Sequence, residues 1–277
     1  MMLIAICFFC IILLGCGEWE SATVGKVSCS FGIFDDFLPS ARKPVKMVSG
    51  NNGNNLYILD ASYYVHSYKR DNLYECVFNL NSSYYFNGLP NDVLFANGNF
   101  YVQDRAQLKS MDNTEACYAR DGFFAIHGNE LAVGSDVGIE IWNIKPCAKN
   151  ISIYSQKIFA LATTGSEYYA AEGIANKPQN LVMLSKNGSM IHREPLSAIT
   201  GNEKNFCSAD RVIANDYGVF LLDKGCGKIG IFDNQVVWRK TIKLDSIGVG
   251  NPLDIAFGEY SYIFILHTSG VVRINVF

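Results

Sequence analysis

The sequence predicts an all-β protein that forms one closed ring of about six four-stranded blades. The first observation is compositional: 18 Phe and 15 Tyr accompany 24 Gly and only 7 Pro in 277 residues, which favours strands joined by tight turns. The second is an internal repeat, in which an apolar stretch, a Gly/Asn turn, a β-rich stretch, a polar corner and another β-rich stretch follow one another. Six copies are visible between residues 45 and 277.

The repeats are spaced as blades would be. Their anchor positions recur on average about every 42 residues, which matches a unit of ~40–45 residues with four strands. These anchors are Met47, Leu94, Phe124, Ala160, Ile213 and Ile255. Because each blade must bury both faces against its neighbours, the ring has to close.

The last blade lacks an outer strand within its own repeat. The chain ends with a third-strand segment, residues 271–277, while a β-type stretch, TVGKVSCSFGI, occupies residues 23–33 ahead of the first repeat. We expect this N-terminal stretch to complete the last blade, which would cover two exposed strand edges at once. An independent N-terminal hairpin is the alternative.

Several stretches carry a family resemblance. LYILD, VFLLDKGCGKIGIFD and QVVWRK resemble the repeats of NHL, YVTN and quinoprotein-type β-propellers. The resemblance covers about residues 45–277 and is loose, and the Gly-His/Trp-Asp pair of WD-type blades is absent. It implies a β-propeller and does not by itself imply an activity.

The N-terminus has the features of an export signal. Residues 3–14 are an unbroken apolar run that would span about 18 Å as a helix, short of the ~30 Å hydrocarbon layer. The run ends in Leu13-Leu14-Gly15-Cys16, which resembles the lipobox of bacterial lipoproteins. That resemblance implies cleavage before Cys16 and acylation of Cys16, palmitate being such a group. An uncleaved signal anchor and an ordinary secretory signal cut elsewhere are the alternatives.

The resulting domain organisation is a lipoprotein signal peptide at 1–15, a tether at 16–23 and a β-propeller at 24–277. Two or three acyl chains would hold the protein at a membrane, so we expect it to be exported and lipid-anchored to the cell membrane or the outer membrane. Gly17 follows the acylated cysteine, with no Asp there to suggest retention at the inner membrane. In a two-membrane bacterium we therefore favour the outer membrane.

Removal of the leader leaves an even number of cysteines for disulfides. Cys7 and Cys10 belong to the leader and Cys16 carries the lipid. The six that remain are Cys29, Cys76, Cys117, Cys147, Cys207 and Cys226. Outside the cytoplasm they can form up to three disulfides, with 15 possible connectivities. None of them forms a CxxC pair, which argues against zinc or thioredoxin-like redox chemistry.

Charge and motifs exclude several functions. The net charge of −3 argues against nucleic acid as a partner, because a phosphate-binding surface needs clustered Lys and Arg. The sequence contains no GxSxG, HExxH, Walker or EF-hand motif, so we expect no cofactor and no catalytic residue of those classes. The sequence does not indicate an oligomeric state.

One set of polar residues recurs at a fixed place in the repeats, the corner where the second strand leads into the third. The set is Asp60, Asp104, Ser135, Glu172, Asp223 and His267. In a propeller these corners share one face, where a ring of four carboxylates could bind a divalent cation or a basic loop of a partner. Alternatively, each side chain accepts hydrogen bonds from its own turn.

Two functions follow from these features. The first is a non-enzymatic, lipid-anchored platform of the cell envelope, which binds another envelope protein as an assembly or adhesion accessory. The alternative is an envelope hydrolase or carbohydrate-active enzyme with a metal-assisted site in the channel mouth, built on Asp60, Asp104, Glu172 and Asp223. The fold is compatible with both.

Overall fold

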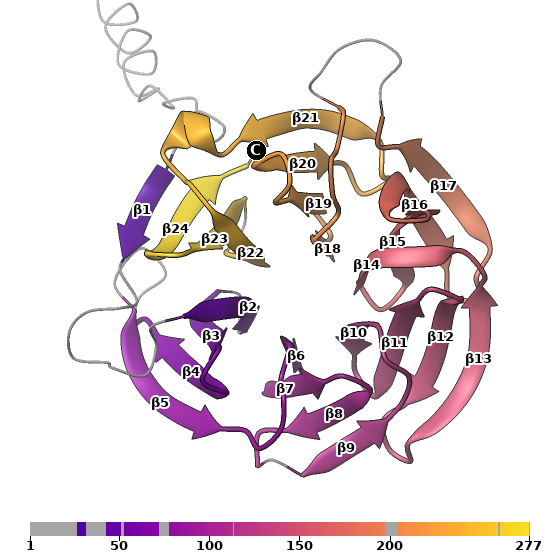
Figure 1. The fold of residues 1–277 in the computed structure, drawn as a ribbon, viewed down its shortest axis with the longest axis horizontal. Coiled ribbons are helices and arrows are strands. Elements are labelled where there is room, and N and C mark those ends of the chain that lie inside the picture. The colour runs from indigo at the N-terminus through magenta and orange to yellow at the C-terminus, as the bar shows by residue number, and fades with distance from the viewer. Residues whose placement is uncertain are drawn as a thin grey trace, which may run out of the picture.

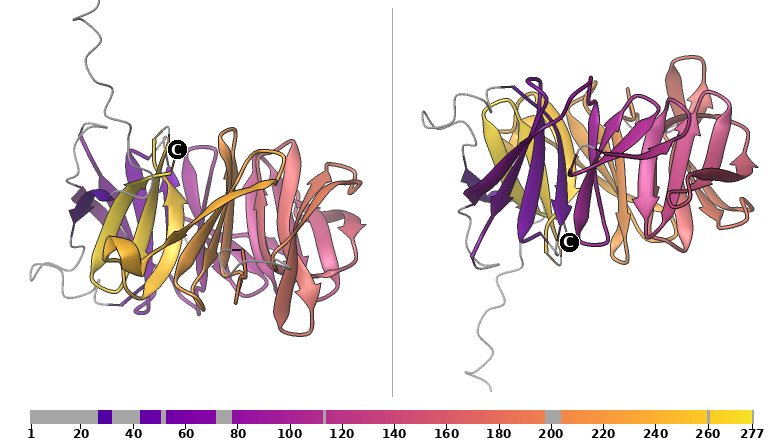
Figure 2. Two further views of the ribbon diagram at one scale, coloured as in Figure 1. Left: turned by 90° about the horizontal axis from the view of Figure 1, so that it is seen from above. Right: turned by 90° about the horizontal axis from the view of Figure 1, so that it is seen from below.

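Six four-stranded antiparallel sheets stand around a central axis as the blades of a propeller (Figure 1). The computed structural model describes residues 27–31, 43–50, 53–71, 78–112, 114–197, 204–259 and 261–276, with the backbone alone for 27–31. Seen from the side, the ring is a flat disc (Figure 2). The prediction of six four-stranded blades is therefore confirmed.

Each blade contributes one strand to each of four concentric layers. The strands nearest the axis are β2 (Pro44–Gly50), β6 (Asp92–Ala96), β10 (Phe123–His127), β14 (Lys157–Thr163), β18 (Arg211–Asn215) and β22 (Pro252–Phe257). The second strands are β3 (Asn55–Asp60), β7 (Asn99–Asp104), β11 (Glu130–Ser135), β15 (Glu167–Ile174), β19 (Gly218–Asp223) and β23 (Tyr262–His267). All six predicted repeat anchors lie on the innermost strands.

The outer two layers complete the blades. The third strands are β4 (Tyr64–Lys69), β8 (Gln107–Ser110), β12 (Gly138–Asn143), β16 (Lys177–Ser185), β20 (Lys228–Phe232) and β24 (Gly270–Asn275). The outermost are β5 (Asn79–Tyr85), β9 (Glu115–Tyr118), β13 (Ala148–Tyr154), β17 (Met190–Pro195), β21 (Trp238–Lys243) and β1 (Val27–Phe31). A short 3-10 helix, η1 (Asp245–Ile247), precedes β22. Among the described residues, no helix has the length and apolar character needed to cross a membrane.

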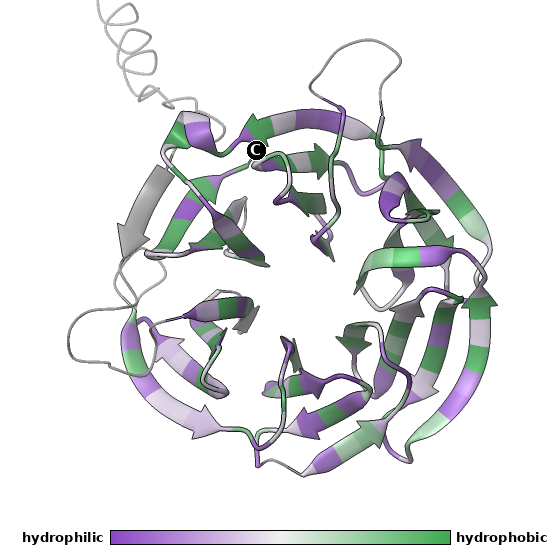
Figure 3. Cartoon of the chain, viewed as in Figure 1, coloured by the Kyte–Doolittle hydropathy of each residue, from purple (hydrophilic) through white to green (hydrophobic). Residues whose placement is uncertain are grey.

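The core is divided among the blade interfaces. The described buried residues form six apolar clusters, and each cluster lies between two neighbouring blades. Successive side chains of a strand point to opposite faces, so Leu56 and Ile58 pack against the last blade while Tyr57 and Leu59 pack against the second. This is why β19 and β20 are buried along their whole length, whereas the outer strands β5, β13 and β17 are mostly exposed. Figure 3 colours the same strands by hydropathy.

The N-terminal strand closes the ring. Strand β1 pairs antiparallel with β24, with Val27 opposite Ile274 and Phe31 opposite Val271. Residues 27–31 thus confirm the expectation that the N-terminal stretch completes the last blade, and the independent hairpin is excluded. Closure thus joins the first and last strands in one sheet.

Polar contacts between the last and first blades reinforce this closure. Arg70, fully buried at the end of β4, pairs with Glu259, which also accepts from Arg273 at 2.6 Å. The backbones of Gly53 and Gly258 approach so closely that a Cβ on Gly53 would lie 2.9 Å from the Gly258 carbonyl carbon. The closing interface therefore combines strand pairing, an apolar cluster and a buried ion pair.

The two faces of the ring differ in their connections. Turns that join first to second strands lie on one face, here named the turn face. Corners that join second to third strands lie on the other, the corner face, together with the starts of the innermost strands; Asp92, which begins β6, lies opposite Gln103 near the end of β7. The predicted polar residues are described below on the corner face, and a second cavity on the turn face.

Candidate functional site

The structure places all six predicted polar residues at the corner face. Asp60, Asp104, Ser135, Asp223 and His267 each end a second strand, and Glu172 lies near the end of β15. The sequence pattern thus located one equivalent position in six blades. What these residues bind stays a prediction, and their local contacts describe what they do within the fold.

Asp60 is held by its own corner. Its Oδ1 accepts from the backbone N–H groups of Ser62 at 2.8 Å and Tyr64 at 3.2 Å, while Oδ2 lies 3.3 Å from His66 Nε2. His66 Nδ1 in turn lies 2.8 Å from Ser83 Oγ on β5. The order Asp, His, Ser has the composition of a nucleophilic triad, but His66 is fully buried inside the blade. A substrate cannot reach that imidazole, so the chain ties three strands together.

Asp104 and Glu172 are each paired with a cation of their own blade. Asp104 accepts from Lys109 Nζ at 2.6 Å and from the Leu89 N–H at 3.2 Å. Glu172 lies 3.0 Å from Arg193 Nε, accepts from Asn180 at 2.9 Å and is bonded by the Tyr154 hydroxyl.

These pairings have electrostatic consequences. Burial, and then the hydrogen bond to Glu172, raise the pKa of the Tyr154 hydroxyl, so it remains a donor. Asp104 and Glu172 already have positive partners in Lys109 and Arg193. These partners neutralise the negative charge that would otherwise attract a bound cation.

Ser135 and His267 complete the set differently. Ser135 Oγ accepts from the Val137 N–H at 3.3 Å and donates to the Gly138 carbonyl at 3.4 Å, which closes a tight corner. His267 is half-buried, and burial lowers the pKa of its imidazole. Among the described residues, no hydrogen bond or ion pair joins Ser135 or His267 to a carboxylate.

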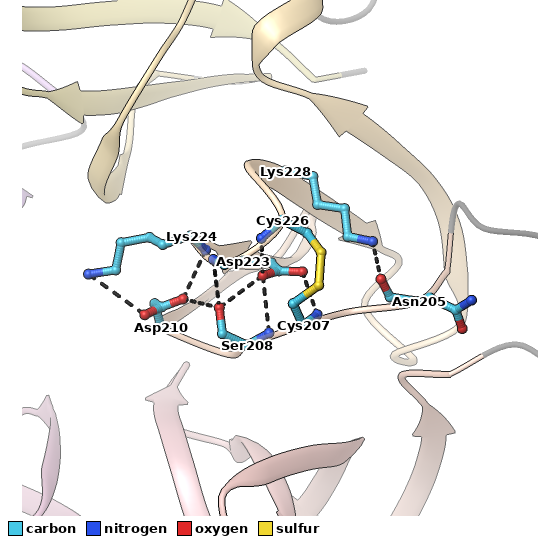
Figure 4. Close-up of a disulfide and its surroundings, with 9 residues drawn as sticks. Asn205, Cys207, Ser208, Asp210, Asp223, Lys224, Cys226 and Lys228 are labelled. Atoms are coloured by element: carbon cyan, nitrogen blue, oxygen red, sulfur yellow. Dashed lines mark hydrogen bonds and ion pairs between the residues drawn. A yellow bond between two sulfur atoms is a disulfide. The ribbon is translucent and has the colours of Figure 1, made fainter.

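Asp223 organises the most elaborate corner (Figure 4). Its two oxygens accept from the N–H groups of Cys207 (2.8 Å), Ser208 (3.1 Å) and Cys226 (3.0 Å) and from the Ser208 hydroxyl (2.9 Å). Asp223 is fully buried, and Cys207 is bonded to Cys226 by a disulfide beside it. The side chain therefore satisfies the donors of a covalently closed loop.

This corner has the residue types of a metal site. The sulfurs of Cys207 and Cys226 and an oxygen of Asp223 lie within 4.8 Å of one another. Metals bind thiolates, however, and here both sulfurs are joined to each other. As a disulfide, Cys207 and Cys226 link the loop that enters β18 covalently to the corner that follows β19.

A second disulfide, Cys117–Cys147, links β9 of the second blade to the turn before β13 of the third. Disulfide bonds are thus confirmed for four of the six predicted cysteines. Cys76 and the side chain of Cys29 lie outside the described residues, as does Cys16. The proposed lipid anchor consequently stays a prediction.

The central channel contains a charged bridge that the sequence patterns did not indicate. Arg211, at the start of β18, donates to Asp92 on β6 at 2.5 Å and lies 3.6 Å from Asp254 on β22. Asp254 is fully buried and also accepts from the Met47 N–H on β2 at 2.8 Å. One signal was present: DVLFA, RVIAN and PLDIAF each carry a charge at the start of an otherwise apolar strand.

On the turn-face side of this bridge lies an open cavity of about 200 Å³. All six innermost strands line it, mainly through residues toward the turn face, such as Ser49, Ile126, Thr163 and Phe257. Arg211 lies at the opposite end of the lining. The channel is therefore an apolar well that is crossed by an ion pair near the corner face.

Comparison with known proteins agrees with this architecture. No protein-family model and no curated protein sequence matches the chain. Among solved structures, the chain is similar to the WD40 domain of Neurospora crassa Pan2, with a TM-score of 0.55 and 10% identity over 89% of this chain and 94% of that domain. At this identity the likeness shows the fold alone, a β-propeller.

Proposed function

We propose that this protein is a lipid-anchored, non-enzymatic propeller of the cell envelope that binds another envelope protein. The closed six-blade ring carries the proposal, because propellers of this kind present broad rigid faces on which partners dock. In a two-membrane bacterium we place it at the outer membrane. Assembly or adhesion of envelope components is the role that suits such a platform.

The corner residues support a platform over an enzyme. Asp60 and Asp223 accept hydrogen bonds from backbone N–H groups of their own corners, and Asp104 and Glu172 pair with Lys109 and Arg193. An active site would be expected to present converging groups that lack such local partners. The ion-pair partners of Asp104 and Glu172 lie in the same blade as each carboxylate, as a structural role requires.

The disulfides support an exported location. Cys117–Cys147 and Cys207–Cys226 would persist in an oxidising compartment and would be reduced in most cytosols. The apolar run that ends at Cys16 in the sequence supplies both the export signal and the acylation site.

Lipid anchoring is tested with Cys16→Ser. We expect the wild type to incorporate an alkyne-labelled fatty acid and to partition with membranes, and the variant to lose both. Identical processing and anchoring of the variant would show that Cys16 is not the acylated residue.

Partner binding is tested by cross-linking the anchored protein in its own envelope and identifying the proteins recovered with it. We expect one envelope protein to be enriched over a Cys16→Ser control. Tight binding of a divalent ion by the purified protein, abolished by Asp60→Ala and by Asp223→Ala, would instead favour the metal-assisted hydrolase.

A further inference from the structure

The turn face carries a second cavity beside the central well. It measures about 180 Å³ and lies between the fourth and fifth blades. Its lining comes from the turn before β15 (Thr164, Ser166, Glu167), the turn before β19 (Asn215, Asp216) and the turn before β21. We name it the side cavity, and the central cavity the well.

The side cavity is polar and negatively charged. Its described lining includes the carboxylates of Glu167 and Asp216 and no Lys, Arg or His. Burial raises the pKa of the lining Tyr169, and the nearby charges of Glu167 and Asp216 raise it further, although a hydrogen bond with Thr164 opposes this. The cavity thus has a negative potential that a cationic group would relieve.

The walls of the side cavity are held in place by local hydrogen bonds. Asn215 Oδ1 accepts from the N–H groups of Tyr217 at 2.9 Å and Gly218 at 3.2 Å, and Thr163 Oγ1 donates to the Glu167 carbonyl at 2.9 Å. Because the cavity is already formed, little conformational entropy is lost when a ligand binds in it. Tyr169, on β15, adds an aromatic side chain to the lining itself.

The two cavities adjoin. Thr163 lines the well and the next residue, Thr164, lines the side cavity; likewise Ala214 lines the well and Asn215 the side cavity. A strand advances about 3.3 Å per residue. An extended segment crossing the turn face could therefore place two side chains, one to three residues apart, in the two cavities.

We infer that the turn face of the fourth and fifth blades binds an extended peptide segment of a partner protein, with an apolar side chain in the well and a Lys or Arg in the side cavity. This inference rests on the proposed function, since it names the surface by which the platform holds its partner. The apolar walls select the first side chain. The carboxylates of Glu167 and Asp216, which form no ion pair among the described residues, select the second. Two hydroxyl groups, of Thr164 and Ser166, donate to Glu167 and leave its charge in place, and a basic side chain is long enough to reach both carboxylates.

The test uses the purified protein as bait for a random heptapeptide library displayed on phage, followed by fluorescence anisotropy of the most enriched peptide. We expect enriched peptides to carry an apolar residue and a Lys or Arg within three positions of it. Binding should weaken as salt is raised, because exposed charge pairs are screened.

Three variants locate the binding. Ser49→Phe fills the well at the mouth, and Asp216→Lys reverses the charge of the side cavity; each should weaken the peptide about tenfold or more. Asp245→Lys makes the same charge change on the corner face and should leave affinity within about twofold. Thermal unfolding of every variant checks that the ring is intact, and Glu167→Gln offers a milder second variant of the side cavity.

The outcomes separate this inference from the proposed function. Absence of enriched peptides, enrichment without basic residues, or affinity unchanged by both Ser49→Phe and Asp216→Lys would overturn the inference. If an envelope partner is cross-linked and its capture is insensitive to both variants, the platform function stands and this surface is wrong. If peptides bind as expected while no envelope partner is found, the surface stands and the proposed function fails.

Discussion

The guanidinium of Arg211 crosses the central channel and pairs at 2.5 Å with the carboxylate of Asp92 on the opposite blade. Burial works against the charge of Arg211, but the carboxylates of Asp254 and Asp92 outweigh it and raise the pKa above its usual value. The guanidinium of Arg211 therefore keeps its positive charge at neutral pH. It links two blades that face each other across the channel.

Arg211→Met should lower the free energy of unfolding by about 2–4 kcal/mol, because it leaves buried carboxylates without their cation. Urea unfolding at neutral pH measures this. Arg239→Met is the control, since Arg239 is 61% exposed in its pair with Asp233 and such surface pairs contribute below about 1 kcal/mol. Equal losses in the two variants would show that the channel bridge does not stabilise the ring.

Gly53→Ala should weaken ring closure. Gly53 has a φ of 83°, and an added Cβ would meet the backbone of Gly258 at 2.9 Å. Gly98→Ala separates the two causes, because Gly98 has a φ of 76° with open space around it. We expect about 1 kcal/mol of lost stability for Gly98→Ala and about 1–3 kcal/mol more for Gly53→Ala, measured by thermal unfolding. A loss no greater than that of Gly98→Ala would contradict a tight contact at the closing interface.

Asp223→Ala should cost about 2–4 kcal/mol, because it deprives three backbone N–H groups of their acceptor. Asp136→Ala removes an exposed carboxylate from the equivalent corner of the third blade and should change stability by less than about 0.5 kcal/mol. Chemical unfolding with the disulfides intact compares them. Similar values would mean that Asp223 is not the organiser of its corner.

The stability of the ring should depend on His267 at mildly acidic pH. Since burial lowers the pKa of this imidazole in the folded state, the unfolded chain binds its proton more readily, and stability falls as pH drops below about 6.5. His267→Gln should flatten the loss between pH 7.5 and pH 5 relative to the wild type in urea unfolding. An unchanged slope would show that His267 titrates as it does in water.

The sequence was most informative where one rule acted in every blade. Recurrence of apolar stretches marked Met47, Ile213 and the other anchors as strand positions, because each blade buries both faces. The same recurrence located corner residues such as Asp60 and Asp223. Closure by residues 27–31 followed from the count of strands.

Contacts between blades escaped prediction. Arg211 and Asp92 lie 119 positions apart, and no local periodicity relates one blade to the blade opposite it. The pairing of Cys117 with Cys147 was likewise one choice among 15 arrangements of six cysteines. The side cavity depends on the shapes of three turns from two blades, which composition alone does not define.

The pairing of β1 with β24 also sets an order of events during synthesis. Among the described strands, β1 is made before all the others and β24 after them, so β1 keeps an open edge until β24 has been synthesised. Such an edge recruits other chains and favours aggregation. Protection of that edge until β1 and β24 pair should therefore favour correct closure of the ring.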